Sequence, residues 1–180
     1  MSTVASNFTI SGEITIEVRI NAAPSLVFPF LTRPARMRTW LAPVVELAPH
    51  VGGRFVMADL NGLRVEGEVV EMVPHSTLTL TWGGIEGLKP GQSILEFTLA
   101  AAGEDTSVRL FHWGLPEPAR DMHRFGWRHA GLPRLKAVIE GRALGGTYLG
   151  DITDARELAP YLTRFSLTPG DRDENARARR

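Results

Sequence analysis

A change of hydrophobic period near residue 118 divides this chain into two kinds of structure. Before it, apolar and polar residues mostly alternate in short segments separated by turn signals, which is typical of β-strands. After it, from about residue 118 to residue 142, apolar residues recur at helical spacing along one side. The order therefore predicts an α+β fold in which a curved antiparallel sheet ends in one long helix. A sheet that grips a helix in this way tends to enclose a space.

The segments before the long helix follow a simple order. Residues 8–20 form a predicted strand with one apolar face, made of Ile14, Ile16, Val18 and Ile20. Pro24 suits the first turn of a short helix, along which Leu26, Val27, Phe30 and Leu31 recur at helical spacing. Pro34 starts a second short helix over residues 35–41, which contains Trp40. About six strands then follow before the long helix.

Some residues predict departures from regular structure. Asn61-Gly62 is a strong hairpin signal, and Gly67 predicts a bulge or bend within a long strand. Pro133 lies inside the long helix, where it removes the hydrogen bond to the carbonyl of His129 and predicts a kink.

The amino-acid composition argues against several classes of function. The chain is 43% hydrophobic and 22% charged, which is ordinary for a globular protein. Lys+Arg and Asp+Glu both number 20, so no overall field attracts nucleic acid, and we expect no nucleic-acid partner. Cysteine is absent, which removes thiolate nucleophiles and thiolate metal ligands. No apolar run is long enough to span a bilayer and no signal peptide is visible, so we expect a cytoplasmic protein.

One folded domain is expected over residues 8–143. The composition then shifts, and residues 144–169 are expected to form an extension that can hold one short helix. Residues 170–180 are polar and charged, and a disordered tail is expected there.

An ordered set of residues along the domain resembles a known superfamily. The matching positions are Ala23-Pro24, Leu31-Thr32, Trp40, Val51-Gly52-Gly53-Arg54-Phe55, Gly67-Glu68-Val69, Pro74, Leu78, Thr81-Trp82, Thr106, Val108, Leu110, His112, Gly114, Gly126-Trp127 and Leu135. With this set the chain resembles the START-like (SRPBCC, Bet v 1-like) superfamily, and within it the Hsp-90 ATPase activator homologue-like group of bacterial proteins. The resemblance implies a helix-grip fold with a cavity between the sheet and the C-terminal helix. It does not imply one activity, since relatives include lipid and hormone binders, polyketide cyclases and the C-terminal half of a chaperone activator.

Aromatic and apolar residues of the inner sheet face and the helix are the candidates for lining this cavity. They are Trp40, Phe55, Met57, Trp82, Phe97, Leu110 and Trp127. The same residues would equally form a filled core, and the sequence leaves both interpretations open.

His112 shares the inner face with Val108 and Leu110 by strand parity. A polar ring among apolar neighbours can anchor a ligand or act as a general acid or base, because its unperturbed pKa lies near neutrality. It can also hold the strand end to the helix by hydrogen bonding. This structural role is favoured.

Other constellations of polar residues carry less weight. Glu66 and Glu68 share a strand face at a spacing that permits acid/base work, but Arg64 on the same face favours a surface charge cluster. The residues His112, His123 and His129 can converge, yet they lack a metal-binding spacing, so we expect no metal and no cofactor.

The opposite face of the sheet carries an unusual apolar group. Phe111 and Trp113 alternate with His112 and therefore point away from the cavity, with Ile94 beside them on the adjacent strand. An apolar patch of this kind normally marks a contact. Either residues 151–165 of the same chain or a second subunit is expected to cover it, and a homodimer is one of the two outcomes.

The preferred hypothesis for function is non-enzymatic binding of a small hydrophobic or aromatic molecule in the cavity, with His112 as polar anchor. An alternative is a cyclase- or lyase-like enzyme that uses His112 as acid or base. A third is a protein-interaction or stress-response module that acts through the patch of Ile94, Phe111 and Trp113.

Overall fold

The computed structural model describes residues 13–60, 62–117 and 119–142 of the 180-residue chain. The chain divides into two units, residues 1–144 and 145–180, and every described residue belongs to the first. The start of the predicted domain at residues 8–12, its last residue, the predicted extension and the predicted tail all lie outside the described residues. The same holds for Asn61 of the predicted hairpin turn.

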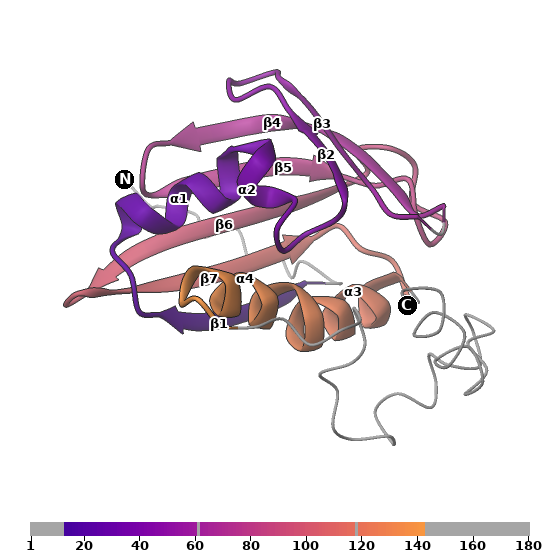
Figure 1. Ribbon diagram of the computed structural model, residues 1–180. Coiled ribbons are helices and arrows are strands. Elements are labelled where there is room, and N and C mark those ends of the chain that lie inside the picture. The colour runs from indigo at the N-terminus through magenta and orange to yellow at the C-terminus, as the bar shows by residue number, and fades with distance from the viewer. Residues whose placement is uncertain (1–12, 61, 118, 143–180) are drawn as a thin grey trace, which may run out of the picture. The chain divides into compact units, whose positions relative to one another are not determined.

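In the described part of the chain, seven antiparallel strands form one sheet, with helical segments on its inner face (Figure 1). The elements in chain order are β1 (Ile14–Ile20), α1 (Pro24–Thr32), α2 (Pro34–Met37), β2 (Val44–Leu47), β3 (Arg54–Ala58), β4 (Arg64–Val73), β5 (Thr77–Trp82), β6 (Ser93–Ala102), β7 (Asp105–Trp113), α3 (Ala119–Gly126), the π-helical turn η1 (Trp127–Gly131) and α4 (Leu132–Ile139). The strand order is β1-β7-β6-β5-β4-β3-β2. This arrangement confirms the predicted helix-grip fold, with two short helices after the first strand and a long helical region at the C-terminal end. Within the described ranges, no helix combines the length and apolarity needed to cross a membrane.

The first helix follows the predicted spacing with one change of face. Pro24 occupies its first turn, as expected. Val27 and Leu31 are buried, and Phe28 joins them. Leu26, which the helical spacing grouped with them, is instead 63% exposed. The apolar stripe of α1 is therefore rotated towards Phe28.

The second helix is shorter than predicted. It ends at Met37, and Trp40 lies in the turn that follows. The Trp40 indole N–H donates to the carbonyl oxygen of Phe30 at 2.8 Å, and the ring is buried. Trp40 thereby ties the connection after α2 to α1.

The irregularity in β4 lies close to, but not at, the predicted residue. The register between β4 and β5 shifts between Val69 and Glu71, so the bulge is two residues beyond Gly67. Gly67 is needed for another reason. A Cβ atom there would lie 1.8 Å from the carbonyl oxygen of Thr81. Only glycine lets the two strands approach so closely.

The long helical region accommodates Pro133 through a π-helical turn. The N–H of Leu132 donates to the carbonyl oxygen of Trp127, five residues earlier, which is the π-helical pattern. Pro133 then falls in the first turn of α4, where its missing N–H is tolerated. The disruption that the sequence predicted at Pro133 therefore takes the form of a π turn directly before it.

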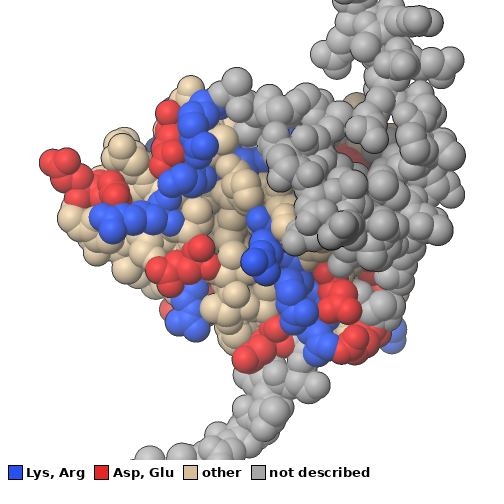
Figure 2. Space-filling model, turned by 90° about the horizontal axis from the view of Figure 1, so that it is seen from below, with Lys and Arg blue, Asp and Glu red and all other residues tan. Residues whose placement is uncertain are grey.

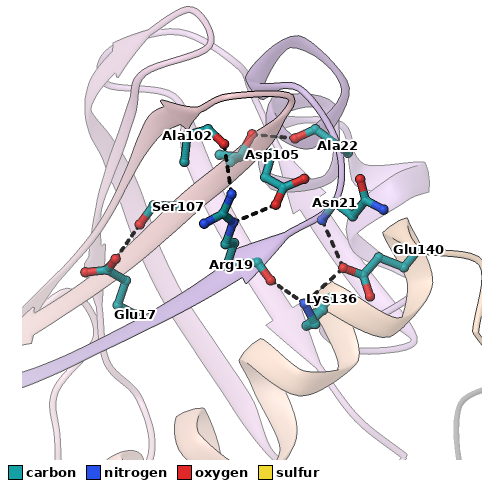
Figure 3. A network of polar contacts seen from close by, with 10 residues as sticks. Glu17, Arg19, Asn21, Ala22, Ala102, Asp105, Ser107, Lys136 and Glu140 are labelled. Atoms are coloured by element: carbon teal, nitrogen blue, oxygen red, sulfur yellow. Dashed lines mark hydrogen bonds and ion pairs between the residues drawn. The ribbon is translucent and has the colours of Figure 1, made fainter.

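Polar contacts fasten the C-terminal end of this helical region to β1 (Figure 3). Lys136 Nζ pairs with Glu140 Oε1 at 2.9 Å and also donates to the Arg19 carbonyl oxygen. The backbone N–H of Asn21 donates to Glu140 Oε1 at 2.9 Å. Arg19 in turn pairs with Asp105 at 2.6 Å, which extends the contact to the start of β7. The last turns of α4 are thus held to the sheet by charged groups.

Two glycines of the helical region give a matched test of the π turn. A Cβ at Gly131 would lie 2.5 Å from Trp127 Cε3, whereas a Cβ at Gly126 would meet nothing within 4 Å. We expect Gly131→Ala to lower the free energy of unfolding by about 1–3 kcal/mol through overpacking. Gly126→Ala should raise it by about 0.5–1 kcal/mol, since Gly126 has helical φ and ψ. Urea unfolding of both variants measures this, and equal effects would contradict the assigned packing of Trp127 on Gly131.

Candidate functional site

The structure brings the predicted cavity-lining residues together in the interior. All of them are buried, with exposed fractions of 5% or less: Trp40, Phe55, Met57, Trp82, Phe97, Leu110, His112 and Trp127. They come from β3, β5, β6 and β7, from the turn after α2 and from η1. His112 and Leu110 both lie on the inner face of the sheet, as strand parity predicted.

The aromatic rings among them form one continuous series of contacts. Phe55 stacks on Trp82 with ring centroids 5.8 Å apart and an interplanar angle of 26°. Trp82 meets Trp127 at 5.3 Å, and Trp127 meets Phe97 edge-on at 6.0 Å. Phe97 then meets Trp40 edge-on at 6.4 Å. Edge-on and offset arrangements of this kind are favourable for aromatic rings, so the series is well packed.

His112 sits at the centre of a fully paired set of hydrogen bonds. Trp127 Nε1–H donates to His112 Nδ1 at 3.1 Å. The Ser93 hydroxyl donates to the carbonyl oxygen of Trp82 at 2.8 Å. Since this hydroxyl has only one proton, the 2.9 Å contact between Ser93 Oγ and His112 Nε2 must be a donation from the imidazole. His112 is therefore neutral, with its proton on Nε2, and both ring nitrogens are engaged.

His123 forms the reverse of this arrangement. Trp82 Nε1–H donates to His123 Nε2 at 3.0 Å, so His123 carries its proton on Nδ1. That N–H donates to the carbonyl oxygen of Ala119 at 2.7 Å. The two imidazoles lie 5.1 Å apart at 88°. One tryptophan of the helix thus bonds a histidine of the sheet, and one tryptophan of the sheet bonds a histidine of the helix.

Burial controls the protonation of both imidazoles. It lowers the pKa of His112 well below the ordinary value, and nearby His123 lowers it further. Burial also lowers the pKa of His123, although the hydrogen bond to Ala119 partly offsets this. Both rings are therefore neutral at neutral pH, as the hydrogen bonds require.

Two members of this cluster, Ser93 and His123, were not predicted from the sequence to belong to it. Ser93 begins β6 directly opposite Trp82, and a small polar residue beside an inward tryptophan was the available signal. His123 was considered only as part of a metal-binding group. The third histidine of that group, His129, lies instead beside Phe125, with ring centroids 4.7 Å apart. Among the described residues, no group of three or more His, Cys, Asp or Glu side chains is placed to hold a metal.

The carboxylate pair of β4 belongs to a surface charge cluster. Glu66 accepts from Arg64 Nε at 2.6 Å and lies 3.8 Å from Arg54. The hydrogen bond from Arg64 holds the pKa of the Glu66 carboxyl below its ordinary value. Glu68 on the same strand is exposed. Basic and acidic side chains also lie next to one another on the face shown in Figure 2.

The patch of Ile94, Phe111 and Trp113 lies on the outer face of the sheet. Ile94 is the direct cross-strand neighbour of Trp113. The rings of Phe111 and Trp113 lie 4.8 Å apart. All three side chains are half-buried.

Comparison with known families gives one match. The model of the family described as activator of Hsp90 ATPase homolog 1-like protein matches residues 21–140, which is most of the described domain. No curated protein resembles the sequence closely enough to count as a match.

Several solved structures share the fold. Protein MLL2253 from Mesorhizobium loti is 25% identical, with a TM-score of 0.61, and the match covers 79% of this chain and 98% of that one. CalU16 from Micromonospora echinospora is 26% identical, with a TM-score of 0.64 and coverage of 82% and 84%. The Aha1 dimer from Colwellia psychrerythraea, solved in solution, is 22% identical, with a TM-score of 0.62 and coverage of 71% and 96%. At that identity the last likeness concerns the fold alone.

Two buried hydroxyls of the sheet test the importance of the cluster. Ser93→Ala leaves the His112 Nε2–H and the Trp82 carbonyl without the partner they have in the structure. We expect it to lower the free energy of unfolding by about 1–3 kcal/mol. Thr79→Val is the matched control, since Thr79 Oγ1 is buried without a hydrogen-bond partner among the described residues. It should be neutral or stabilising. Urea unfolding measures both, and similar losses would show that the Ser93 contacts contribute little.

Proposed function

The chain belongs to the family of activator of Hsp90 ATPase homolog 1-like proteins, and we propose that it binds a small, uncharged hydrophobic or aromatic molecule between its sheet and its C-terminal helical region. The observation that carries this proposal is the continuous series of aromatic rings on the inner face, from Trp40 to Phe55. Pockets for small molecules are built from such side chains together with a few placed polar groups.

The charge state of the interior supports an uncharged ligand. In the described part of the chain, His112 and His123 hydrogen-bond the indoles of this series and Ser93 bonds His112, and these hydrogen bonds require both imidazoles to be neutral. A buried ion without a counter-charge is costly. An uncharged molecule that offers an acceptor can replace a histidine nitrogen as partner of an indole N–H. A flat apolar molecule matches the faces of Trp82 and Trp127.

The geometry favours binding over acid/base catalysis by His112. A general base needs a free lone pair aimed at the substrate. His112 uses Nδ1 to accept from Trp127 and Nε2–H to donate to Ser93. Its low pKa also makes it a poor proton donor near neutrality. The cyclase- or lyase-like alternative would require His112 to leave these partners first.

Native mass spectrometry of the protein purified from its own host, followed by denaturing extraction, is the direct test of binding. We expect a reproducible bound small molecule without net charge. Titration with N-phenyl-1-naphthylamine, an uncharged aromatic probe, should quench tryptophan fluorescence saturably. Phe97→Leu should weaken probe binding by about two- to tenfold, because Phe97 contacts two inner tryptophans.

Phe111→Leu is the matched control, since it makes the same change on the outer face of the neighbouring strand. It should leave probe affinity unchanged. Bare protein from the host combined with no saturable probe binding would overturn the proposal, and equal weakening by both variants would place the site elsewhere.

The outer face of the sheet supports a second proposal, which is that the chain forms a homodimer. The half-buried patch of Ile94, Phe111 and Trp113 is suited to contact with a second copy of the chain. A solved structure with the same fold, the Aha1 of Colwellia psychrerythraea, is a dimer. We expect the full chain to form a dimer at micromolar concentrations.

Trp113→Ser should shift that dimer to monomer without unfolding the domain, as measured by sedimentation velocity. Leu26→Ser, an exposed apolar residue on α1, is the control and should leave the dimer intact. A wild-type protein that sediments as a monomer would contradict the proposed homodimer.

A further inference from the structure

Two reciprocal hydrogen bonds join the first half of the C-terminal helical region to the sheet. Trp127 of η1 donates to His112 of β7, and Trp82 of β5 donates to His123 of α3. Each bond uses the one unprotonated nitrogen of its imidazole. Protonation of either ring would place an N–H against an indole N–H, and two donors cannot bond each other.

Among the described residues, none of the groups that surround His112 carries a negative charge that would stabilise a positive charge on its ring. Its β-sheet neighbours are Ile14 on β1 and Leu95 and Ser93 on β6, and Trp82 of β5 packs against its edge. The helical region contributes Trp127 and His123. His123 is the one titratable group in this set, and a charge on it would oppose a charge on His112.

The surroundings of His123 are similar. Trp82 and His112 face it from the sheet, and Ala119 accepts its second N–H. The charged residues of its own helix bond each other or the preceding loop. Arg124 pairs with Asp121 at 3.2 Å, and Arg120 pairs with Glu117.

The second half of the helical region is held by different chemistry. Glu140 bonds Lys136 and the backbone N–H of Asn21. These contacts lower the pKa of the Glu140 carboxyl, so the anchor persists under mildly acidic conditions. Arg134 Nε also donates to the carbonyl oxygen of Trp40 at 2.9 Å. The first half ends in the π turn, and π turns are among the places where helices kink.

We propose that the paired histidines form an acid-sensitive latch: mild acid releases α3 and η1 from the sheet while α4 stays attached, which opens the interior. The latch works whether or not a ligand is present. Its role as a release mechanism for a bound molecule rests on the proposed function.

The direction and size of the effect follow from linkage. Both imidazoles have a lower pKa in the closed state than the ordinary value of about 6.5. As pH falls below about 6.5, the opened state takes up protons that the closed state cannot bind. Each such proton favours opening by about tenfold per pH unit. The closed state therefore keeps its full stability above about pH 6.5 and loses it on acidification.

Hydrogen–deuterium exchange of the full, ligand-free chain at a series of pH values tests the latch. Rates are converted to protection factors, which removes the pH dependence of intrinsic exchange. Below about pH 6.5, protection of residues 119–131 should fall by about tenfold or more per pH unit. Residues 132–140 and the sheet should keep theirs.

Variants identify the histidines as the cause. His112→Asn with His123→Gln retains an acceptor for each indole N–H but cannot titrate, so residues 119–131 should stay protected in acid. His50→Gln, which changes an exposed histidine, should behave like the wild type. Equal acid loss along both halves of the helical region, or an unchanged acid response in the double variant, would overturn the proposal.

Histidine ¹⁵N spectra of the wild type provide a measurement that does not depend on the variants folding. We expect His112 as the Nε2–H tautomer and His123 as the Nδ1–H tautomer at neutral pH. The indole N–H signals of Trp82 and Trp127 should change together with the titration of these rings. Indole signals that stay unchanged while the histidines titrate would overturn the latch. Because no ligand is present in these measurements, a failure of the proposed function leaves their outcome unaffected.

Discussion

The two tryptophan–histidine hydrogen bonds between sheet and helical region are the constraint on which this structure depends. An indole N–H that is buried without a partner costs free energy, and so does a buried imidazole nitrogen. Trp82 and Trp127 each bring one donor into the interior, and His112 and His123 each bring the matching acceptor. All four groups find their hydrogen-bond partners at one orientation of the helical region relative to the sheet. Hydrophobic burial is non-directional and would let the helical region slide along the sheet. These directional hydrogen bonds therefore specify one arrangement of the interior.

The backbone is adapted to that one arrangement. Trp127 can lie along the helix only because residue 131 has no side chain, and the π turn sets the two residues in contact.

Side chains from the helical layer also contact the two edge strands of the open sheet. Arg38, just after α2, donates to the carbonyl oxygen of Val45 on the edge strand β2. Lys136 of α4 donates to that of Arg19 on the other edge strand, β1. A cation from the helical layer thus satisfies a carbonyl at each edge, which reduces the tendency of edge strands to pair with other chains.

Sequence periodicity was enough to predict the order of elements and the inward direction of His112, because alternation in a strand depends only on neighbouring residues. Features that depend on two distant segments were not accessible in the same way. Gly67 was interpreted as a bulge, yet it is required by the approach of the Thr81 carbonyl, and the bulge itself lies beyond Val69. The partnership of His123 with Trp82 joins residues 41 positions apart and depends on the helical phase before the π turn. No local pattern encodes that phase.

An interior in which the imidazole nitrogens and indole N–H groups already satisfy one another sets the conditions for any molecule that enters it. Such a molecule must displace rings that pack well together. Its apolar contacts therefore only replace the packing free energy that is lost when the rings separate. The gain has to come from a polar group that takes over a hydrogen bond released on entry. The indole N–H of Trp127 or of Trp82 becomes free whenever its histidine moves away, and a neutral acceptor on the ligand can pair with it. The same bonds that hold the helical region closed therefore determine which molecules can open it, and favour flat, uncharged ones that carry an acceptor at the edge of the ring.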